Sequence, residues 1–453
     1  MHCALVRPDE RGGFARDLAA SWSQRDDATW MFELRPSARF HDGSPVTSAD
    51  VVATLRSVLD PAMGSPRRGA LAPVSSIEAE GPSRVVFHLA RPGVAFLEGA
   101  TVGVLPAPLA AQPRHRSGVL PGCGPYRVES ADDHAVVLRA YDGYADGAPT
   151  LPAIEFRVVP DTVMRTLQLR SGDLDLVQNA LEPDATRSLA SDSSLRVSVT
   201  PYDAYQYLGI NHRHPALRDL RVRRAIAYAI DREAIVTYVL AGQAEVATGL
   251  VPPHQAAYSG DVRRYRFDPA RARALLGAAG FPDPDGPGPL PRLRLRYATS
   301  TVELRRRIAE VVAANLADVG IAVTIESSEW GAFFDRVGRG DFDLYSLAWI
   351  GIRDPDLQRV TFHSAMVPPA GSNRGYFSSR RMDRLTERAR DTADPAARLL
   401  LYARVQRTAA RALPYVPLWW PRNVVVTSRR VERFVPDPAG DLRGLVRTAI
   451  LPP

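Results

Sequence analysis

LAASWSQRDDATWMFELRPSARFHDGSPVTSADVV, at residues 18–52, is the part of the chain most informative about the fold. In WMFELR, residues 30–35, large apolar side chains recur at every second position, which is typical of a strand with one buried face. The DD pair at 26–27 lies where a hairpin turn from the preceding run would fall. The TS pair at 47–48 can cap a helix that begins near Asp50. We therefore predict a strand, a turn, a second strand and the start of a helix.

The bulk composition is that of an ordinary soluble protein. The chain has 453 residues, 45% hydrophobic and 24% charged, enough for roughly three domains of about 150 residues. No apolar run approaches the ~18 residues of a membrane span. The formal net charge is +7 and all 57 basic residues are arginine. Because these arginines are scattered among aspartates, we attribute them to coding bias and predict no nucleic-acid partner.

The two cysteines, Cys3 and Cys123, are too few for a disulfide framework or a metal cluster. Cys123 lies between two glycines with no histidine or lysine motif nearby, so we predict a small packed side chain rather than a reactive thiol. The first 30 residues contain no apolar segment of the kind found in signal peptides.

Strands and helices alternate along the rest of the chain. Predicted strands at 293–297 and 321–325 flank an amphipathic helix at 304–316, which indicates a right-handed parallel crossover. A central strand is predicted at 344–349 and a long helix at 222–238. The pattern favours an α/β fold.

Two segments also carry a family resemblance. The pieces Leu-Ala-x-Ser-Trp, Trp-x-Phe-x-Leu-Arg and Phe-His-Asp-Gly-x-Pro-Val-Thr lie within residues 18–52, and NxxxPxLxDxxVRRAIxxAIDR covers 211–232. Both closely resemble the family 5 extracellular solute-binding proteins, the dipeptide, oligopeptide and nickel receptors of ABC importers. Gly-Cys-Gly-Pro-Tyr at 122–126 is similar to a family segment that usually carries threonine at the cysteine position.

The resemblance implies a periplasmic-binding-protein-like fold, with two large lobes around a ligand cleft and a small extra lobe. The chain would cross between the large lobes near Asn211 and Trp420. Family members are exported, so we expect an N-terminally incomplete chain from an extracytoplasmic, lipid-anchored protein. The implied division is a first large lobe at 1–17, 119–210 and 421–453, a small lobe at 18–118, and a second large lobe at 211–420.

The implied function is that of a substrate-binding receptor, which closes its lobes over a ligand and delivers it to a membrane permease. A peptide or peptide-like solute is the first expectation. A metal chelate, an opine and an oligosaccharide remain alternatives within the family. We expect a monomer whose partners are the ligand and the permease subunits, and no cofactor is implied.

Two other classes were weighed. An enzyme would need a recognisable catalytic motif, and we find neither Gly-x-Ser-x-Gly nor His-Glu-x-x-His nor a phosphate-binding glycine loop. The carboxylates Asp354 and Asp356 have surface or capping roles as their simplest explanation, and His212 and His214 lack further metal ligands nearby in sequence. A ligand-sensing regulator would need a DNA-binding domain, for which the residues before Leu18 offer no room.

The predicted ligand site centres on the end of the strand at 344–349, because residues just past the carboxyl end of a strand face the cleft in open α/β sheets. Gln178 and Asn179 follow another short strand in the same way. The full predicted set is Trp349, Gly351, Asp354, Trp330, Phe333, Tyr205, Gln178, Asn179 and Asn373.

One position departs from the family pattern. In peptide-binding relatives an acidic residue commonly follows Trp-x-Gly and pairs with the ligand's ammonium group, whereas this chain has Ile352 there. A buried ammonium without its carboxylate loses several kcal/mol. Either Asp354 replaces that carboxylate or the ligand carries no such amine.

Overall fold

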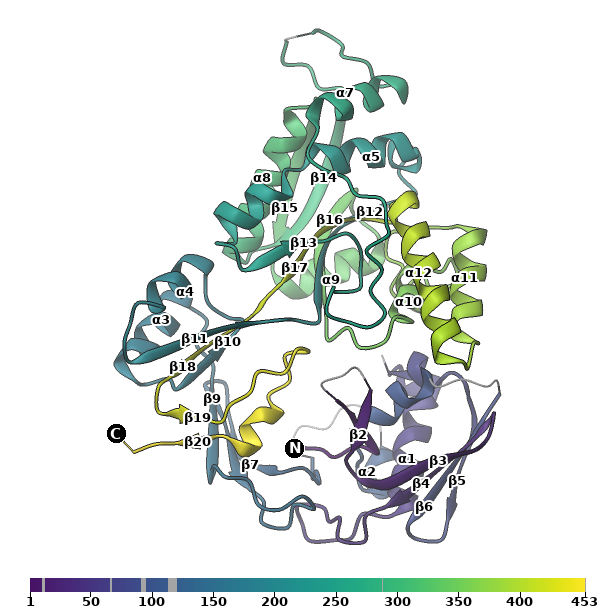
Figure 1. The fold of residues 1–453 in the computed structure, drawn as a ribbon, viewed down its shortest axis with the longest axis vertical. Coiled ribbons are helices and arrows are strands. Elements are labelled where there is room, and N and C mark those ends of the chain that lie inside the picture. The colour runs from purple at the N-terminus through teal and green to yellow at the C-terminus, as the bar shows by residue number, and fades with distance from the viewer. Residues whose placement is uncertain (10–12, 66, 91–94, 113–119, 287, 453) are drawn as a thin grey trace.

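The computed structural model describes residues 1–9, 13–65, 67–90, 95–112, 120–286 and 288–452 (Figure 1). It is an α/β structure with several sheets, as the sequence predicts. The predicted lobe boundary between residues 118 and 119 lies outside the described residues.

The stretch at 18–52 builds one antiparallel sheet and the helix beside it. The sheet has the order β3-β4-β6-β5, and the predicted strand, turn, strand and helix are confirmed. Thr47 donates from its N and Oγ1 to the Asp50 carboxylate, which closes a capping box at the start of the helix. The elements are β3 (Ala19–Asp26), β4 (Thr29–Leu34), β5 (Val74–Glu80), β6 (Arg84–Leu89), α1 (Ser48–Leu59) and α2 (Ala107–Ala110).

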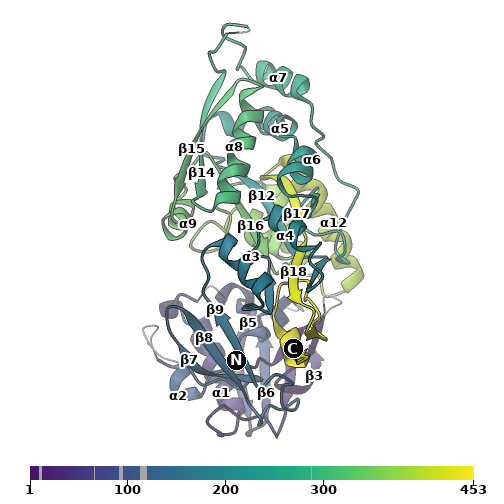
Figure 2. The ribbon, with the colours of Figure 1, turned by 90° about the vertical axis from the view of Figure 1, so that its left-hand side faces the viewer.

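Smaller sheets surround this one. A three-stranded sheet runs in the order β7-β8-β9 and another in the order β10-β18-β11, while β1-β2 and β19-β20 are two-stranded. Figures 1 and 2 place α3 and α4 between the β7–β9 sheet and the upper part of the molecule. The elements are β1 (Val6–Pro8), β2 (Phe14–Arg16), β7 (Tyr126–Ala131), β8 (Ala135–Ala140), β9 (Ala153–Arg157), β10 (Leu176–Gln178), β11 (Leu195–Thr200), β18 (Asn423–Ser428), β19 (Val431–Glu432), β20 (Ala449–Ile450), α3 (Thr162–Ser171) and α4 (Pro183–Leu189).

The largest sheet has the order β13-β17-β12-β16-β14-β15. Its strands are β12 (Ala204–Ile210), β13 (Ala244–Val246), β14 (Leu293–Ser300), β15 (Ile321–Ser328), β16 (Leu344–Ile350) and β17 (Tyr415–Pro421). β14 pairs parallel with both β15 and β16, which confirms the predicted parallel crossover through α8 (Glu303–Ala317). The other helices packed around this sheet are α5 (Leu220–Ala229), α6 (Arg232–Ala234), α7 (Pro269–Ala278), α9 (Trp330–Arg339), α10 (Leu357–Phe362), α11 (Arg380–Arg390) and α12 (Pro395–Ala412).

The predicted single helix at 222–238 was wrong. The chain leaves helical geometry at Ile230, whose ψ is 117°, and Asp231 then accepts a hydrogen bond from Ala234 N to begin a new short helix. A π-helical turn, η5 (Ile235–Val239), completes the segment. Asp231 is a good N-cap, so a new helix can begin directly after the break. The spacing of apolar residues continues unchanged across this break, and the spacing alone therefore predicted one helix.

The chain passes twice between the β10-β18-β11 sheet and the six-stranded sheet. One passage lies between β11 and β12, at residues 200–204, and the other lies between β17 and β18, at 421–423. β12, the first strand of the six-stranded sheet along the chain, therefore begins at Ala204 and precedes the crossing predicted at Asn211. We call residues 204–421 the upper segment, since Figure 1 draws it above the remaining sheets.

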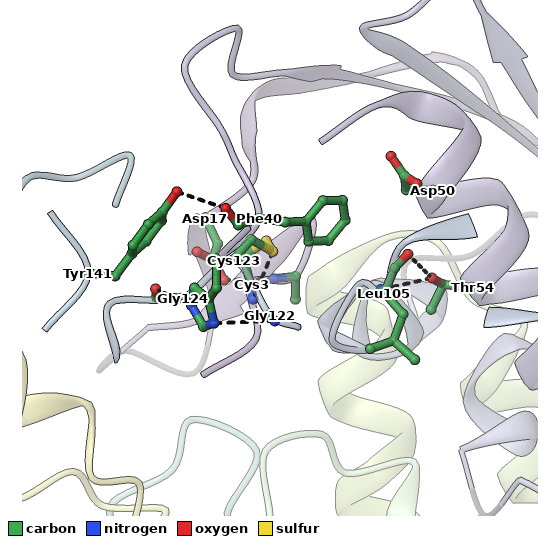
Figure 3. The surroundings of a disulfide bond; sticks show 12 residues. Cys3, Asp17, Phe40, Asp50, Thr54, Leu105, Gly122, Cys123, Gly124 and Tyr141 are labelled. Atoms are coloured by element: carbon green, nitrogen blue, oxygen red, sulfur yellow. Dashed lines mark hydrogen bonds between the residues drawn. A yellow bond between two sulfur atoms is a disulfide. The ribbon is translucent and has the colours of Figure 1, made fainter. Parts of the chain in front are cut away.

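The two cysteines form a disulfide, whereas the sequence predicts only a small packed side chain at Cys123. Cys3 and Cys123 are both buried, and their Cα atoms lie 5.2 Å apart (Figure 3). A backbone hydrogen bond brings the two segments together, because Gly124 N donates to Met1 O at 2.7 Å. The cysteines are 120 residues apart, so local sequence gave no sign that they meet.

Candidate ligand-binding site

Three parallel strands of the upper segment end at the same edge of the sheet. β14, β15 and β16 end at Ser300, Ser328 and Ile350. α8 and α9 start directly after the first two of these strands, so their N-terminal turns lie at this edge. Both views place α9 at the end of the upper segment nearest the lower sheets (Figures 1 and 2). This is the carboxyl edge at which open α/β sheets bind ligands.

Aromatic side chains cover one face of the sheet there. Tyr205 of β12 lies opposite Trp349 of β16, so both point to the same face. Tyr207 stacks on Tyr415 with ring centroids 4.0 Å apart. Trp349 is partly buried, and its indole Nε1 has no hydrogen-bond partner among the described residues. The predicted position of Trp349 at the end of a central strand is confirmed, but its contact with ligand stays a prediction.

The first turns of α9 add two more rings at this edge. Trp330 is 44% exposed and Phe334 is 41% exposed. Their ring centroids are 5.9 Å apart with an interplanar angle of 28°. Large exposed aromatic side chains that stack on one another are a surface on which a ligand can pack.

Two arginines that the sequence analysis did not select join these rings. The Arg305 guanidinium of α8 lies 4.6 Å from the Trp330 ring centroid. The Arg374 guanidinium lies 5.1 Å from the Phe334 ring and 5.7 Å from the Trp349 ring. We call Trp330, Phe334, Trp349, Arg305 and Arg374 the arginine–aromatic cluster. No sequence signal marked Arg305, Arg374 or Phe334, because nothing in local spacing reports where a long side chain points.

The positive charge of Arg374 affects the pKa of three buried tyrosines near it. Burial raises the pKa of Tyr207, Tyr345 and Tyr415, and the positive charge of Arg374 acts against that rise in all three. These three phenols therefore stay neutral. We call the three tyrosines the polar floor of the arginine–aromatic cluster.

Three predicted ligand residues are structural in this conformation. Phe333 and Tyr205 are buried in the core, with exposures of 0% and 2%. Asn373 is also buried, and its Nδ2 donates to His363 O and Phe377 O while its Oδ1 accepts from Phe377 N. The asparagine closes a loop of backbone, which occupies its amide fully.

The amides of Gln178 and Asn179 lie at a chain passage rather than at the cluster. Both donate to Asn423 Oδ1, at 3.1 and 2.9 Å. Asn179 Oδ1 in turn accepts from Val424 N at 2.8 Å. They therefore join β10 to the start of β18, next to the passage at 421–423.

The loop after β16 holds the remaining predicted residues. Gly351 has a φ of 71°, in the left-handed region that favours glycine. Ile352 is buried, and its N donates to Asp203 O at 3.0 Å. Asp354 accepts from Arg398 Nη2 at 2.6 Å and from Asp356 N at 2.7 Å. The Asp354 carboxylate is thus engaged by a buried arginine, which leaves it poorly placed to replace the missing acidic residue.

The neighbouring Asp356 gives the fold a testable pH dependence. Burial raises the pKa of Asp356 to about 6, with Arg390 acting against the shift. Between its ordinary value of 3.8 and 6 the folded protein binds the proton more strongly than the unfolded chain, so stability falls as pH rises through this range. Asp356→Asn keeps an acceptor for the Tyr402 hydroxyl. As the pH rises from 4 to 7, the free energy of unfolding of the parent protein should fall by on the order of 2 kcal/mol relative to that of the Asp356→Asn variant. Urea unfolding across that range checks this, and parallel pH profiles would contradict it.

A separate cavity of about 290 Å³ lies elsewhere on the upper segment. Its lining includes Arg232, Arg263, Asp231 and Pro417, and none of the predicted ligand residues. Arg232 is buried and donates to Pro417 O at 3.0 Å, and burial lowers its pKa to about 10. The arginine thus joins the start of α6 to β17.

Within the described ranges, no group of three or more His, Cys, Asp or Glu side chains is arranged to hold a metal. The ring of His212 lies 3.2 Å from Pro414 O, and burial lowers its pKa to about 3. Among the helices that the structure describes, none is both long and apolar enough to cross a bilayer.

Comparison with known proteins gives consistent matches along the chain. The sequence profile described as "Bacterial extracellular solute-binding proteins, family 5 Middle" matches residues 13–365. The chain is 28% identical to the probable di/tripeptide-binding protein 5 of Pseudomonas aeruginosa, over 95% of this chain and 86% of that protein.

Two solved structures extend the comparison to the fold. The oligopeptide-binding protein AppA of Bacillus subtilis, in complex with a nonapeptide, matches with a TM-score of 0.90 at 25% identity, over 100% of this chain and 93% of that one. The protein AgaA from A. tumefaciens, in complex with agropinic acid, matches with a TM-score of 0.86 at 25% identity, over 100% of this chain and 93% of that one.

Proposed function

Because the chain belongs to family 5 of the bacterial extracellular solute-binding proteins, we propose that it captures a peptide or peptide-like solute and delivers it to the permease of an ABC importer. The ligand binds at the carboxyl edge of β14, β15 and β16, against Trp330 and Trp349. The observation that carries the proposal is the exposed aromatic surface at this edge, in a chain that matches peptide-binding relatives from end to end. An opine-like solute is the second candidate, favoured by the likeness to AgaA.

The two chain passages support a hinge. Only residues 200–204 and 421–423 link the upper segment to the rest along the chain, so rotation about two adjacent connections can move it as one body. We place the second large lobe at 204–421 and the small lobe from residue 18 to the region before 120. Ligand contacts to both large lobes then favour the closed form.

The disulfide supports an extracytoplasmic location. Cys3–Cys123 joins buried positions of the fold, and such bonds persist in oxidising compartments rather than in the cytosol. Docking to the permease would keep the protein at the membrane. A lipid anchor and a monomeric state stay predictions of the family resemblance.

Titration with a library of di- to pentapeptides tests the function. We expect at least one peptide to bind with a dissociation constant of about 1 μM or tighter, and small-angle scattering to show a smaller radius of gyration in its presence. No binding by any peptide, with unchanged scattering, would refute peptide capture.

Trp330→Ala tests the position of the site. Because Trp330 is 44% exposed, its removal should leave the fold intact while it weakens binding by about tenfold, as expected for an aromatic contact residue. Trp22→Ala is the matched control, since Trp22 is a partly buried strand residue that packs against Phe32 of the lower sheet. Equal affinities for the parent and Trp330→Ala proteins would place the ligand elsewhere.

A further inference from the structure

The arginine–aromatic cluster has a charge imbalance. Among the described residues, no carboxylate oxygen lies within 4.0 Å of a guanidinium nitrogen of Arg305 or Arg374. Both side chains are partly buried. A partly buried cation without a counter-charge is unfavourable in the free protein, and a ligand that supplies the negative charge would relieve this.

Four carboxylates of the surrounding elements are engaged by other partners. Glu303 pairs with Arg306 at 3.0 Å and Glu326 pairs with Arg336. Glu329 accepts from Gly331 N at 2.7 Å, as the cap of α9. Asp354 pairs with Arg398 at 2.6 Å. An ion pair between one of these four carboxylates and Arg305 or Arg374 would therefore break an existing contact.

Donors without partners point to the same chemistry. Arg305 Nη1, Trp349 Nε1 and Ser300 Oγ are buried atoms with no hydrogen-bond partner among the described residues. The first two can only donate, and a hydroxyl can donate as well. Register puts Ser300 on the face of the sheet that carries Tyr345 and Trp349, because Ala298 lies opposite Tyr345. A group that accepts several hydrogen bonds at once, such as a carboxylate, matches this set.

The N-terminus of α8 also favours an anion, although more weakly than the two arginines. α8 begins two residues before Arg305, and no side chain caps its N-terminus. The free N–H groups and partial positive charge of a helix N-terminus favour an anion. The position that pairs with an ammonium group in peptide-binding relatives is Ile352, which is buried.

We propose that Arg305 and Arg374, with the indole of Trp349, bind a carboxylate of the ligand, so that the protein selects solutes by their carboxylate and not by their amine. The inference rests on the proposed function and narrows it to carboxylate-bearing solutes. Trp330 and Phe334 supply the flat surfaces on which the rest of the ligand lies. Arg374 is the specificity-determining side chain, because its guanidinium lies near both Trp349 and Phe334.

The test uses each peptide of the library in three forms: unmodified, amidated at the C-terminus and acetylated at the N-terminus. Calorimetry should show amidation weakening binding on the order of 10- to 100-fold, the range for losing hydrogen bonds to a charged group. Acetylation should leave the affinity nearly unchanged. If acetylation is the more damaging change, or if all three forms bind equally, the inference is overturned while the proposed function stands.

Variants tie this selectivity to the cluster. Arg374→Gln should bind the unmodified peptide as weakly as the parent protein binds the amide, and it should no longer distinguish the two. Arg305→Gln should show the same loss to a smaller degree, and it provides a second reading if the first variant folds poorly. Arg306→Gln is the matched control, since the next residue of α8 is exposed and paired with Glu303. Unchanged selectivity in both cluster variants would overturn the assignment.

If no peptide of the library binds, a second titration distinguishes the two proposals. Succinate and glutarate are then titrated, with tryptophan fluorescence as the signal. Quenching in the parent protein that is lost in Arg374→Gln would support carboxylate binding and refute peptide capture. No response to either dicarboxylate would overturn both proposals.

Discussion

Replacing Gly209 with alanine is expected to destabilise the upper segment by about 3 kcal/mol or more, the upper range for overpacking a core. A Cβ at Gly209 would lie 2.1 Å from Cε1 and 2.3 Å from Cζ of Tyr345. The Tyr345 ring cannot move aside, because it is fully buried and packs against Phe342 at a centroid distance of 4.5 Å. Urea unfolding followed by tryptophan fluorescence measures the loss.

Gly277→Ala is the matched control. Gly277 lies in α7, and an added Cβ there would meet nothing within 4 Å. Because alanine is the better helix former, that variant should gain up to about 1 kcal/mol. Combining Gly209→Ala with Tyr345→Ala should cost less than the sum of the two changes, since the clash is then gone. A Gly209→Ala protein as stable as the parent would show that the ring is free to move.

The contact between Gly209 and Tyr345 also connects stability to the candidate ligand site. Tyr345 lies beside Tyr207, at 5.8 Å between ring centroids, and both feel the charge of Arg374. A displaced Tyr345 ring would therefore shift the polar floor behind the arginine–aromatic cluster. We expect Gly209→Ala to weaken ligand binding as well as the fold.

The elements predicted well from sequence are those fixed by short-range pattern. The hairpin at 18–34 and the capped helix α1 follow from alternation and from a local capping box. The parallel pairing of β14 and β15 follows from strand, helix and strand in succession. The family resemblance is confirmed by the profile match.

The candidate site could be predicted only in part. Trp349 was selected because its place at the end of a strand is visible in sequence. Phe333 follows Trp330 closely in α9 but turns into the core, since helical neighbours point in different directions. Arg305 and Arg374 come from α8 and from a loop, and only the packed structure brings their guanidinium groups to the neighbouring rings of Trp330 and Phe334.

The Cys3–Cys123 bond gives the second large expected effect. It closes a loop over a sequence separation of 120 residues that contains the β3-β4-β6-β5 sheet and α1. Replacing both cysteines with serine should cost about 2–5 kcal/mol, because the unfolded chain regains the freedom that so long a loop removes. Calorimetric unfolding measures the change, and dithiothreitol should lower the transition of the parent protein by a similar amount while it leaves the double variant unaffected.

The position of the bond predicts which part of the molecule loosens first. Leu18 N donates to Ala4 O at 2.8 Å, so the residues beside Cys3 hold the chain directly before β3. Gly122, next to Cys123, accepts from His41 N at 2.8 Å and holds the other end. The disulfide thus joins the two ends of the segment that contains the β3-β4-β6-β5 sheet. Hydrogen exchange in the Cys3→Ser/Cys123→Ser protein should rise in residues 19–89 before it rises in the upper segment. A uniform rise across both parts would mean that the β3-β4-β6-β5 sheet unfolds only with the whole molecule.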